Sequence, residues 1–249
     1  MREDGPGGEV ATPGSQVPPA GRLRPLARLV AAGMLDPELA ALAWLLLEDG
    51  VPVIVCGPGR GLRDGLLEAL VAALRADRRP DPSAPAAEHR LVRVAGPLAI
   101  STPPGLLRAA LAATTGRSGL AATIEATDFP GVLAVLHAQG LTDDEISFLG
   151  AVLVLGPGGE PGDVRGGSPA RVVAAHYLRP VARDAGGHVQ RLGPAVLAVW
   201  DPGRSEYDHF AWGIYPELAV RTGGRAGDLE ADQRDRTERV GREAAGFRA

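Results

Sequence analysis

The sequence predicts an α/β fold built on a mostly parallel sheet, followed by a small β-rich appendage. An apolar run at residues 51–56 breaks at three glycines, Gly57, Gly59 and Gly61, and leads directly into a helix with apolar residues at helical spacing. Strand-like and helix-like segments then alternate as far as residue 155, the pattern of parallel strands covered on both faces by helices. Beyond residue 156 two β-rich runs flank a turn, which predicts a hairpin.

Composition limits the classes of function. The chain has 249 residues, 45% of them hydrophobic, so it can bury a sizeable core. Its net charge of −4 does not favour nucleic-acid binding, which needs a basic face. All 26 basic residues are arginine, so no lysine is present anywhere. No apolar run is long enough to span a membrane and the first residues lack the apolar core of a signal peptide, so we expect a cytoplasmic protein.

The elements are predicted in order from caps, breaks and periodicity. A lead without periodicity covers residues 1–21, and the α/β core is assigned to 22–155. Within this core the predicted helices lie at 26–33, 36–50, 64–76, 104–115, 128–140 and 142–149, and the predicted strands at 51–56, 91–95, 97–100, 118–124 and 151–155.

The remainder of the chain is predicted to be less regular. Residues 156–222 form the hairpin-rich part, with runs at 171–181 and 189–200 around a turn at 183–188. The aromatic-rich segment 208–215 is expected to pack on this β unit. Residues 223–249 are charged and poor in apolar side chains, which predicts a solvated tail, helical around 229–240.

The glycine-rich turn after residue 56 has the layout of a phosphate-binding loop. Free N–H groups and the positive dipole end of the following helix favour an anion at such a turn. The candidate nucleotide-binding residues are therefore Gly57, Pro58, Gly59, Arg60, Gly61, Leu62, Arg63 and Asp64.

The turn departs from the nucleotide-binding pattern G-x-x-x-x-G-K-[ST]. When the pattern starts at Gly57, its second glycine, lysine and hydroxyl residue fall on Leu62, Arg63 and Asp64. Only Arg63 could mimic its counterpart, and Asp64 would place a carboxylate where magnesium needs a hydroxyl. Two interpretations stay open: a cradle that binds ATP weakly, and a glycine turn that only joins strand to helix.

Three stretches give the chain a family resemblance. Residues 29–42 and 53–61 resemble the approach to the phosphate loop in the type II/type IV secretion and type IV pilus ATPases, and residues 112–128 look like that family's histidine segment. The resemblance covers roughly residues 24–215. It implies a RecA-like P-loop core, usually assembled as a ring hexamer that couples ATP hydrolysis to pilus assembly or protein export.

The chain lacks the family's catalytic residues at each catalytic motif that can be compared. Arg117 and Glu125 stand where the resemblance expects histidines, and no acid lies between Arg90 and Ile124 to support a metal. We therefore expect a degenerate member with no catalytic residues and no metal ligands. It would be an assembly or regulatory subunit that forms homo- or hetero-oligomers with secretion ATPases or an inner-membrane platform protein. An atypical active motor and a stand-alone interaction scaffold are the alternatives.

Other candidate residues carry less information. The five histidines, which lack metal-ligand spacing, are His89, His137, His176, His188 and His209. Glu125 could act as a catalytic base at a strand end, but it has no partner carboxylate in the sequence. The single cysteine, Cys56, ends the apolar run and is predicted to be a small buried hydrophobic residue.

Overall fold

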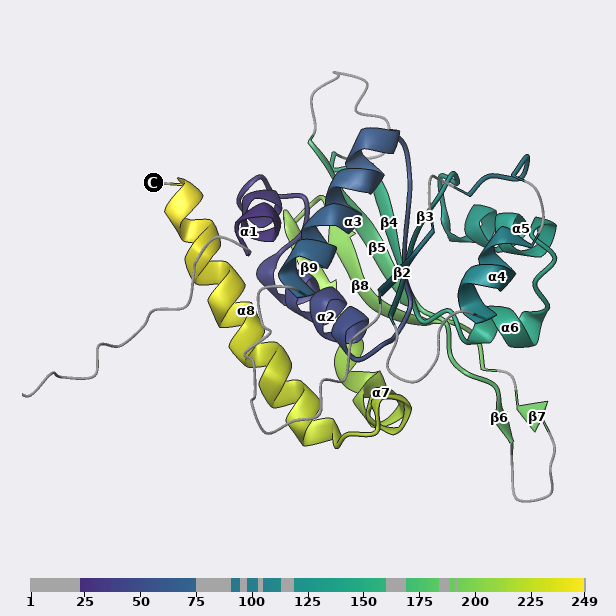
Figure 1. The fold of residues 1–249 in the computed structure, drawn as a ribbon. Coiled ribbons are helices and arrows are strands. Elements are labelled where there is room, and N and C mark those ends of the chain that lie inside the picture. Colours follow the sequence, from purple (N-terminus) through teal and green to yellow (C-terminus); the bar gives the residue numbers. More distant parts are fainter. Residues whose placement is uncertain are drawn as a thin grey trace, which may run out of the picture.

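One seven-stranded sheet forms the centre of the molecule, with strands in the order β2-β3-β1-β4-β5-β8-β9 (Figure 1). The computed structural model describes residues 23–74, 91–94, 98–102, 105–112, 119–159, 169–183, 189–190 and 192–248. The strands of this sheet are β1 (Val53–Cys56), β2 (Leu91–Arg93), β3 (Gly119–Ile124), β4 (Ala151–Pro157), β5 (Ala170–Tyr177), β8 (Ala195–Asp201) and β9 (Glu206–His209). A separate two-stranded ladder joins β6 (Ala182–Arg183) to β7 (Val189–Gln190).

The sheet is mixed, not mostly parallel as the sequence predicted. Strands β2, β3, β1 and β4 are parallel neighbours, whereas β4–β5, β5–β8 and β8–β9 are antiparallel. The change of direction follows β4, since β5, the next strand along the chain, pairs antiparallel with it. Because helices and one mixed sheet make up the fold, the predicted α/β class is confirmed.

The predicted C-terminal appendage is part of the main sheet. Strand β5 pairs with β4 from Ala151↔Tyr177 to Pro157↔Ala170, and β4 itself runs past the predicted boundary at residue 155. The predicted hairpin is present, since β5 pairs antiparallel with β8 and β6 pairs with β7. Most of its tip, residues 184–188, lies outside the described residues.

Helices cover the sheet from two sides (Figure 1). One layer packs with Val53, Val55 and Leu153 and consists of α1 (Arg24–Ala31), α2 (Pro37–Glu48), α3 (Arg60–Leu74) and α8 (Ala226–Arg248). The other packs with Ile54, Val152 and Val154 and includes α4 (Leu106–Ala112), α5 (Phe129–Ala138) and α6 (Asp143–Ser147). Between β9 and α8 the chain forms the short 3₁₀ helix η1 (Ala211–Ile214) and α7 (Tyr215–Thr222).

Local signals in the sequence explain where the helices start and stop. The Asp36 side chain accepts a hydrogen bond from the Leu39 N–H at 2.9 Å and so caps α2, whose first residue is proline. Thr142 and Glu145 form the predicted capping box at α6. Gly50 ends the α2 segment in a left-handed conformation, with φ of 81°, and delivers the chain to β1.

Helix α8 corrects the prediction of a solvated tail. It spans 23 residues and buries one face against α1 and α2, at Leu229, Gln233, Arg236, Val240 and Ala244. These positions recur every three or four residues, but two of the five side chains are polar, so the apolar pattern is incomplete. The buried face explains why α2 can be hydrophobic all round, because the sheet layer lies on one side of it and α8 on another.

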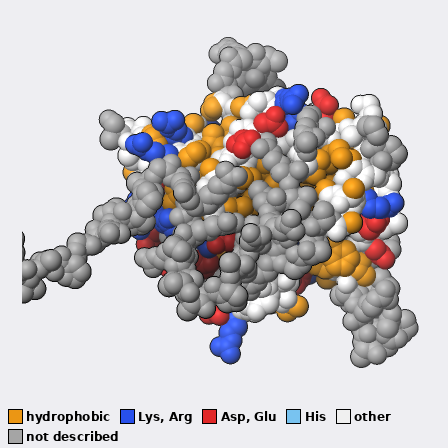
Figure 2. Space-filling view, in the orientation of Figure 1, with side chains coloured by type: hydrophobic (Ala, Val, Ile, Leu, Met, Phe, Trp, Pro, Cys, Tyr) orange, Lys and Arg blue, Asp and Glu red, His pale blue; other side chains and the backbone are white. Residues whose placement is uncertain are grey.

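The visible surface carries no extended field of one charge. Figure 2 shows arginine and acidic side chains in small separate groups around hydrophobic ones, where described residues are visible. Within the described residues, no helix is both long enough and apolar enough to cross a membrane.

Candidate functional site

The glycine turn lies at the carboxyl edge of β1, which is central in the sheet between β3 and β4. This placement confirms the predicted internal strand, which covers Val53–Cys56 and so begins two residues later than predicted. Gly57 has a φ of 121°, and a Cβ atom there would collide with the Leu155 carbonyl group of β4. Its N–H donates to the Ala126 carbonyl oxygen at 2.7 Å, so the turn is tied to the segment after β3. Glycine is therefore required at this position by packing alone.

The helix after the turn begins four residues earlier than predicted. It starts at Arg60, and the N–H groups of Leu62 and Arg63 both donate to the Gly59 carbonyl, at 3.1 and 3.2 Å. Only Gly57, Pro58 and Gly59 remain between strand and helix. A phosphate-binding loop needs several successive non-helical N–H groups aimed inward. Residues that would have to wrap a phosphate are wound into the first turn of α3 instead.

Arg63 turns back into this loop. Its side chain is only 4% exposed, and Nη1 donates to the Gly57 carbonyl oxygen. Its Nε atom is buried and has no hydrogen-bond partner among the described residues. The guanidinium is thus committed to the inside of the turn, where it ties α3 to the end of β1. It does not project from the mouth of the loop as a phosphate-binding cation would.

Asp64 holds the position that the nucleotide-binding pattern gives to a hydroxyl. Its carboxylate accepts from Arg60 Nε at 3.3 Å and from Thr123 Oγ1 at 3.4 Å. Thr123 lies near the end of the adjacent strand β3, so Asp64 links the first turn of α3 to that strand. The negative charge at this point disfavours an anion at the helix N-terminus.

Among the described residues, the carboxyl ends of the neighbouring strands supply no second catalytic group. Glu125 is exposed, and its N–H donates to the Leu98 carbonyl oxygen at 2.7 Å. Asp128 caps α5 by accepting from the Gly131 N–H at 2.8 Å. Glu125 therefore remains a lone carboxylate, as in the sequence.

Cys56 is fully buried, which confirms the structural interpretation of this residue. Burial, together with the nearby charge of Asp128 and against the opposing charge of Arg63, raises the pKa of its thiol to about 12. The thiolate is the reactive form of cysteine, so this side chain does not serve as a nucleophile.

The histidines are not brought together. His137, His176 and His209 lie on α5, β5 and β9, and the described part of the chain contains no cluster of side chains able to hold a metal ion. His89, His188 and Arg117 lie outside the described residues.

His209 has a structural partner. Its Nε2 atom lies 2.7 Å from Asp36 Oδ2, which joins β9 to the N-cap of α2. Burial alone would lower the pKa of His209, but Asp36, with Glu38 and Asp208 nearby, raises it above its ordinary value.

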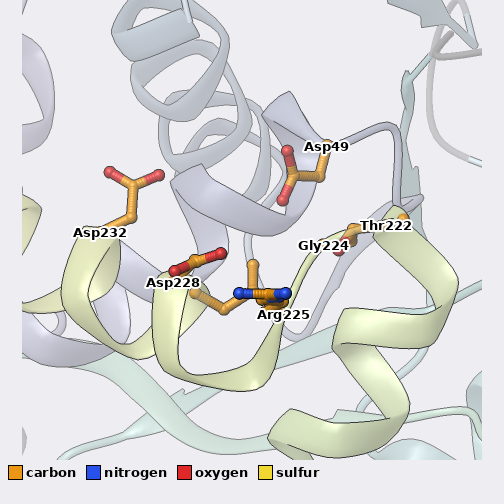
Figure 3. A pocket seen from close by; sticks show the side chains of 8 residues that line it. Asp49, Thr222, Gly224, Arg225, Asp228 and Asp232 are labelled. Carbon is orange, nitrogen blue, oxygen red and sulfur yellow. The ribbon is translucent and has the colours of Figure 1, made fainter.

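The sequence analysis missed two surface hollows, and neither includes the glycine turn. One, of about 160 Å³, lies where α2 ends and α8 begins, at the amino edge of β1 (Figure 3). Asp49, Arg225, Asp228 and Asp232 line it. The second, of about 180 Å³, lies between the α5–α6 region and the segments flanking the β6–β7 ladder, and its lining includes Leu133, Leu178 and Leu192. Parallel α/β sheets bind ligands at the carboxyl edge, so the first hollow lies at the opposite end from the expected site.

No protein-family model matches the chain, and no curated protein matches it. The residues predicted to bind nucleotide do lie together, around the start of α3. Their arrangement is a short, tied turn filled by an arginine side chain. Chemically it can stabilise the strand–helix junction, and it offers no preformed group for phosphoryl transfer.

Proposed function

We propose that the chain is a degenerate relative of the secretion and pilus ATPases, with a RecA-like P-loop-type core, acting as an assembly or regulatory subunit of a type II/type IV secretion or pilus apparatus. In this role it does not hydrolyse nucleotide. One observation carries the proposal: the buried Arg63 guanidinium is bonded to the Gly57 carbonyl group inside the turn where a phosphate-binding loop would hold its ligand.

The topology around β1 supports the proposed relationship to the secretion and pilus ATPases. The parallel strands run in the order β2-β3-β1-β4, and α3 packs in one helical layer while α4 and α5 pack in the other. The chain leaves β1 on one face and reaches β4 along the opposite face. Open α/β folds bind ligands at such a switch point, outside the carboxyl end of the central strand. The order of helix, strand, glycine turn and helix is also the basis of the sequence resemblance.

The loss of hydrolysis follows from what phosphoryl transfer requires. The reaction needs a loop cation on the phosphates, a magnesium ion with its ligands, and a group that positions water. Arg63 is committed to Gly57, and Asp64 replaces the hydroxyl. A carboxylate about 4 Å from a phosphate oxygen costs on the order of 4 kcal/mol at an effective dielectric of about 20.

Calorimetric titration with ATP and magnesium, combined with a phosphate-release assay, tests the catalytic part. We expect weak or no binding and background hydrolysis for the unmodified protein. The double substitution Asp64→Thr with Leu62→Gly should improve ATP affinity more than Arg63→Lys, because it removes both the charge and the branched side chain, while hydrolysis stays at background. Robust magnesium-dependent hydrolysis by the unmodified chain would instead establish the atypical motor.

The assembly role needs a separate experiment. An intact secretion ATPase and an inner-membrane platform protein encoded beside this chain would be co-expressed with it and isolated through a tag on this chain. We expect stable co-isolation of at least one of them without added nucleotide. Failure with both would reject the subunit role and leave the stand-alone scaffold as the better account.

A further inference from the structure

Helix α7 and the short helix before it present an uncovered apolar stripe. Trp212 is 73% exposed and Val220 is 85% exposed, and Pro216 between them is also exposed. Phe148, which is 58% exposed, lies beside the same helix because its carbonyl oxygen accepts a hydrogen bond from Arg221. We call these four residues the α7 patch.

Spacing and burial place the stripe on one side of the helix. Pro216 and Val220 are four residues apart on α7, which keeps them on neighbouring parts of one face, and Trp212 lies on the 3₁₀ helix η1 that leads into α7. The opposite side is fixed in the core, since Ala211, Ile214, Leu218 and Ala219 are buried. The exposed side chains therefore cannot turn inward without unfolding this segment.

The charged residues beside the stripe are already engaged. Glu217 accepts from Arg179, with Nε at 2.8 Å from Oε2, and Arg221 donates to Phe148 and to the Tyr177 hydroxyl at 3.3 Å. No member of the α7 patch carries a charge. Scattered exposed apolar residues are ordinary, but a tryptophan that leads a contiguous apolar stripe is typical of the centre of a protein interface.

The exposed apolar area would supply about half of one side of a standard interface. When an aromatic side chain is taken as about 200–250 Å² and valine as about 150 Å², the exposed fractions of Trp212, Phe148 and Val220 amount to roughly 400 Å². A standard interface takes about 800 Å² from each partner, somewhat more than half of it apolar. The α7 patch would therefore supply most of the apolar share of one side.

We propose that the partner on this surface is a second copy of the chain, with α7 antiparallel to α7 of that copy and a two-fold axis near Pro216. Trp212 and Val220 lie at equal sequence distances on either side of Pro216. The axis would place Trp212 of one copy against Val220 of the other, at both ends of the contact. Such self-complementarity is the condition for a two-fold interface. It also places Trp212 near Arg221 of the second copy, in reach of a cation–π contact.

This inference deepens the proposed function by naming one partner of the assembly subunit, and it rests on that function for its biological role only. Sedimentation velocity of the unmodified chain at about 100 μM should give a dimer. Trp212→Ala should weaken dimerisation by at least tenfold, whereas Ile100→Ala, a matched control at a side chain that is 67% exposed outside the patch, should leave it unchanged. Thermal unfolding of both variants would check that the fold is retained.

Cysteine cross-linking tests the position of the axis. Under mild oxidation Pro216→Cys should form a covalent dimer, because two residues at a two-fold axis can come within the short Cβ–Cβ distance of a disulfide. Ala245→Cys, exposed on α8, is the control and should stay monomeric on a denaturing gel. The native Cys56 is buried and will not interfere.

A monomer at this concentration, or a dimer insensitive to Trp212→Ala, would overturn the inference, as would equal cross-linking of the two cysteine variants. These outcomes are independent of the nucleotide assays. A dimer that hydrolyses ATP would refute the proposed function and leave the α7 interface in place. A monomer that binds no ATP would refute the α7 interface and leave the proposed function in place.

Discussion

Arg236 is expected to fasten α8 to the helical layer, and its replacement gives a quantitative test. Its side chain is 8% exposed, Nη1 lies 2.6 Å from Glu48 Oε2, and the guanidinium carbon is 4.5 Å from the centre of the Trp44 ring. Asp232, one turn earlier, accepts from Nη2 at 3.1 Å. One side chain therefore combines an ion pair, an intrahelical bond and a cation–π contact.

The expected cost is smaller than for a fully buried pair. Breaking a buried pair costs about 3–5 kcal/mol, but the Glu48 and Asp232 side chains are 29% and 48% exposed, so water can solvate them once the arginine is removed. A partly desolvated cation–π contact contributes about 1 kcal/mol, and the two methylenes that alanine lacks contribute about 0.8 kcal/mol each. We expect Arg236→Ala to lower the free energy of unfolding by about 3 kcal/mol.

Arg236→Met keeps the stem over Trp44 and removes only the charge, so we expect a loss of about 1 kcal/mol. Urea unfolding followed by circular dichroism would measure both values. The matched control is Arg234→Ala on the same helix, where the side chain is 65% exposed and its pair with Glu230 spans 3.6 Å; this loss should stay below about 0.5 kcal/mol. Equal losses for the alanine and methionine variants would contradict this expectation, because they would show that the charge and its hydrogen bonds, not the packing of the stem, hold the helix.

Three further predictions concern residues around β1 and α2. His209→Gln should destabilise the protein most near pH 6 and progressively less as the pH rises through the folded-state pKa of His209. The reason is that a raised folded-state pKa adds stability only while the histidine is protonated. Unfolding free energies at several pH values would measure this. Gly57→Ala should cost at least about 2 kcal/mol, from positive φ and the collision with Leu155, in the same urea assay. Cys56 should not react with a thiol reagent at pH 8 until the protein unfolds, because burial raises its pKa to about 12, and fast labelling of the folded protein would contradict this.

The sequence predicted helix starts and strands correctly where the signal lay within a few neighbouring residues. Asp36 followed by Pro37, and the Thr142–Glu145 capping box, set helix starts that the structure confirms. The apolar run ending at Cys56 predicted a buried internal strand correctly. These features depend on neighbours within four residues, so the sequence contains all the information needed.

The errors arose where distant residues decide the outcome. The direction of β5 relative to β4 depends on how the connection returns the chain to the sheet, and neither strand encodes that direction in its own pattern. Helix α8 seemed solvated because Gln233 and Arg236 occupy core positions, where a tertiary bond to Glu38 and an ion pair to Glu48 satisfy them. The aromatic-rich segment does pack on β8 as predicted, and only the exposure of its Trp212 went unpredicted.

At the candidate site the sequence identified which residues would meet but not how they would be arranged. The substitutions at Leu62, Arg63 and Asp64 indicated a defective phosphate loop. The early start of α3 and the inward turn of Arg63 could not be predicted, since the first depends on the Gly59 carbonyl as acceptor and the second on the Gly57 carbonyl.

The contacts of α8 also set the order in which the molecule can be completed. Arg236 meets Glu48 across 188 residues of chain, and Arg248 bonds to Val30 across 218. Contacts between such distant positions form late, because the entropy of closing a long loop opposes them until other structure shortens the path. During synthesis the apolar surface of α2 therefore stays uncovered until α8 has left the ribosome. A chain interrupted before residue 226 would present that surface to solvent and to chaperones.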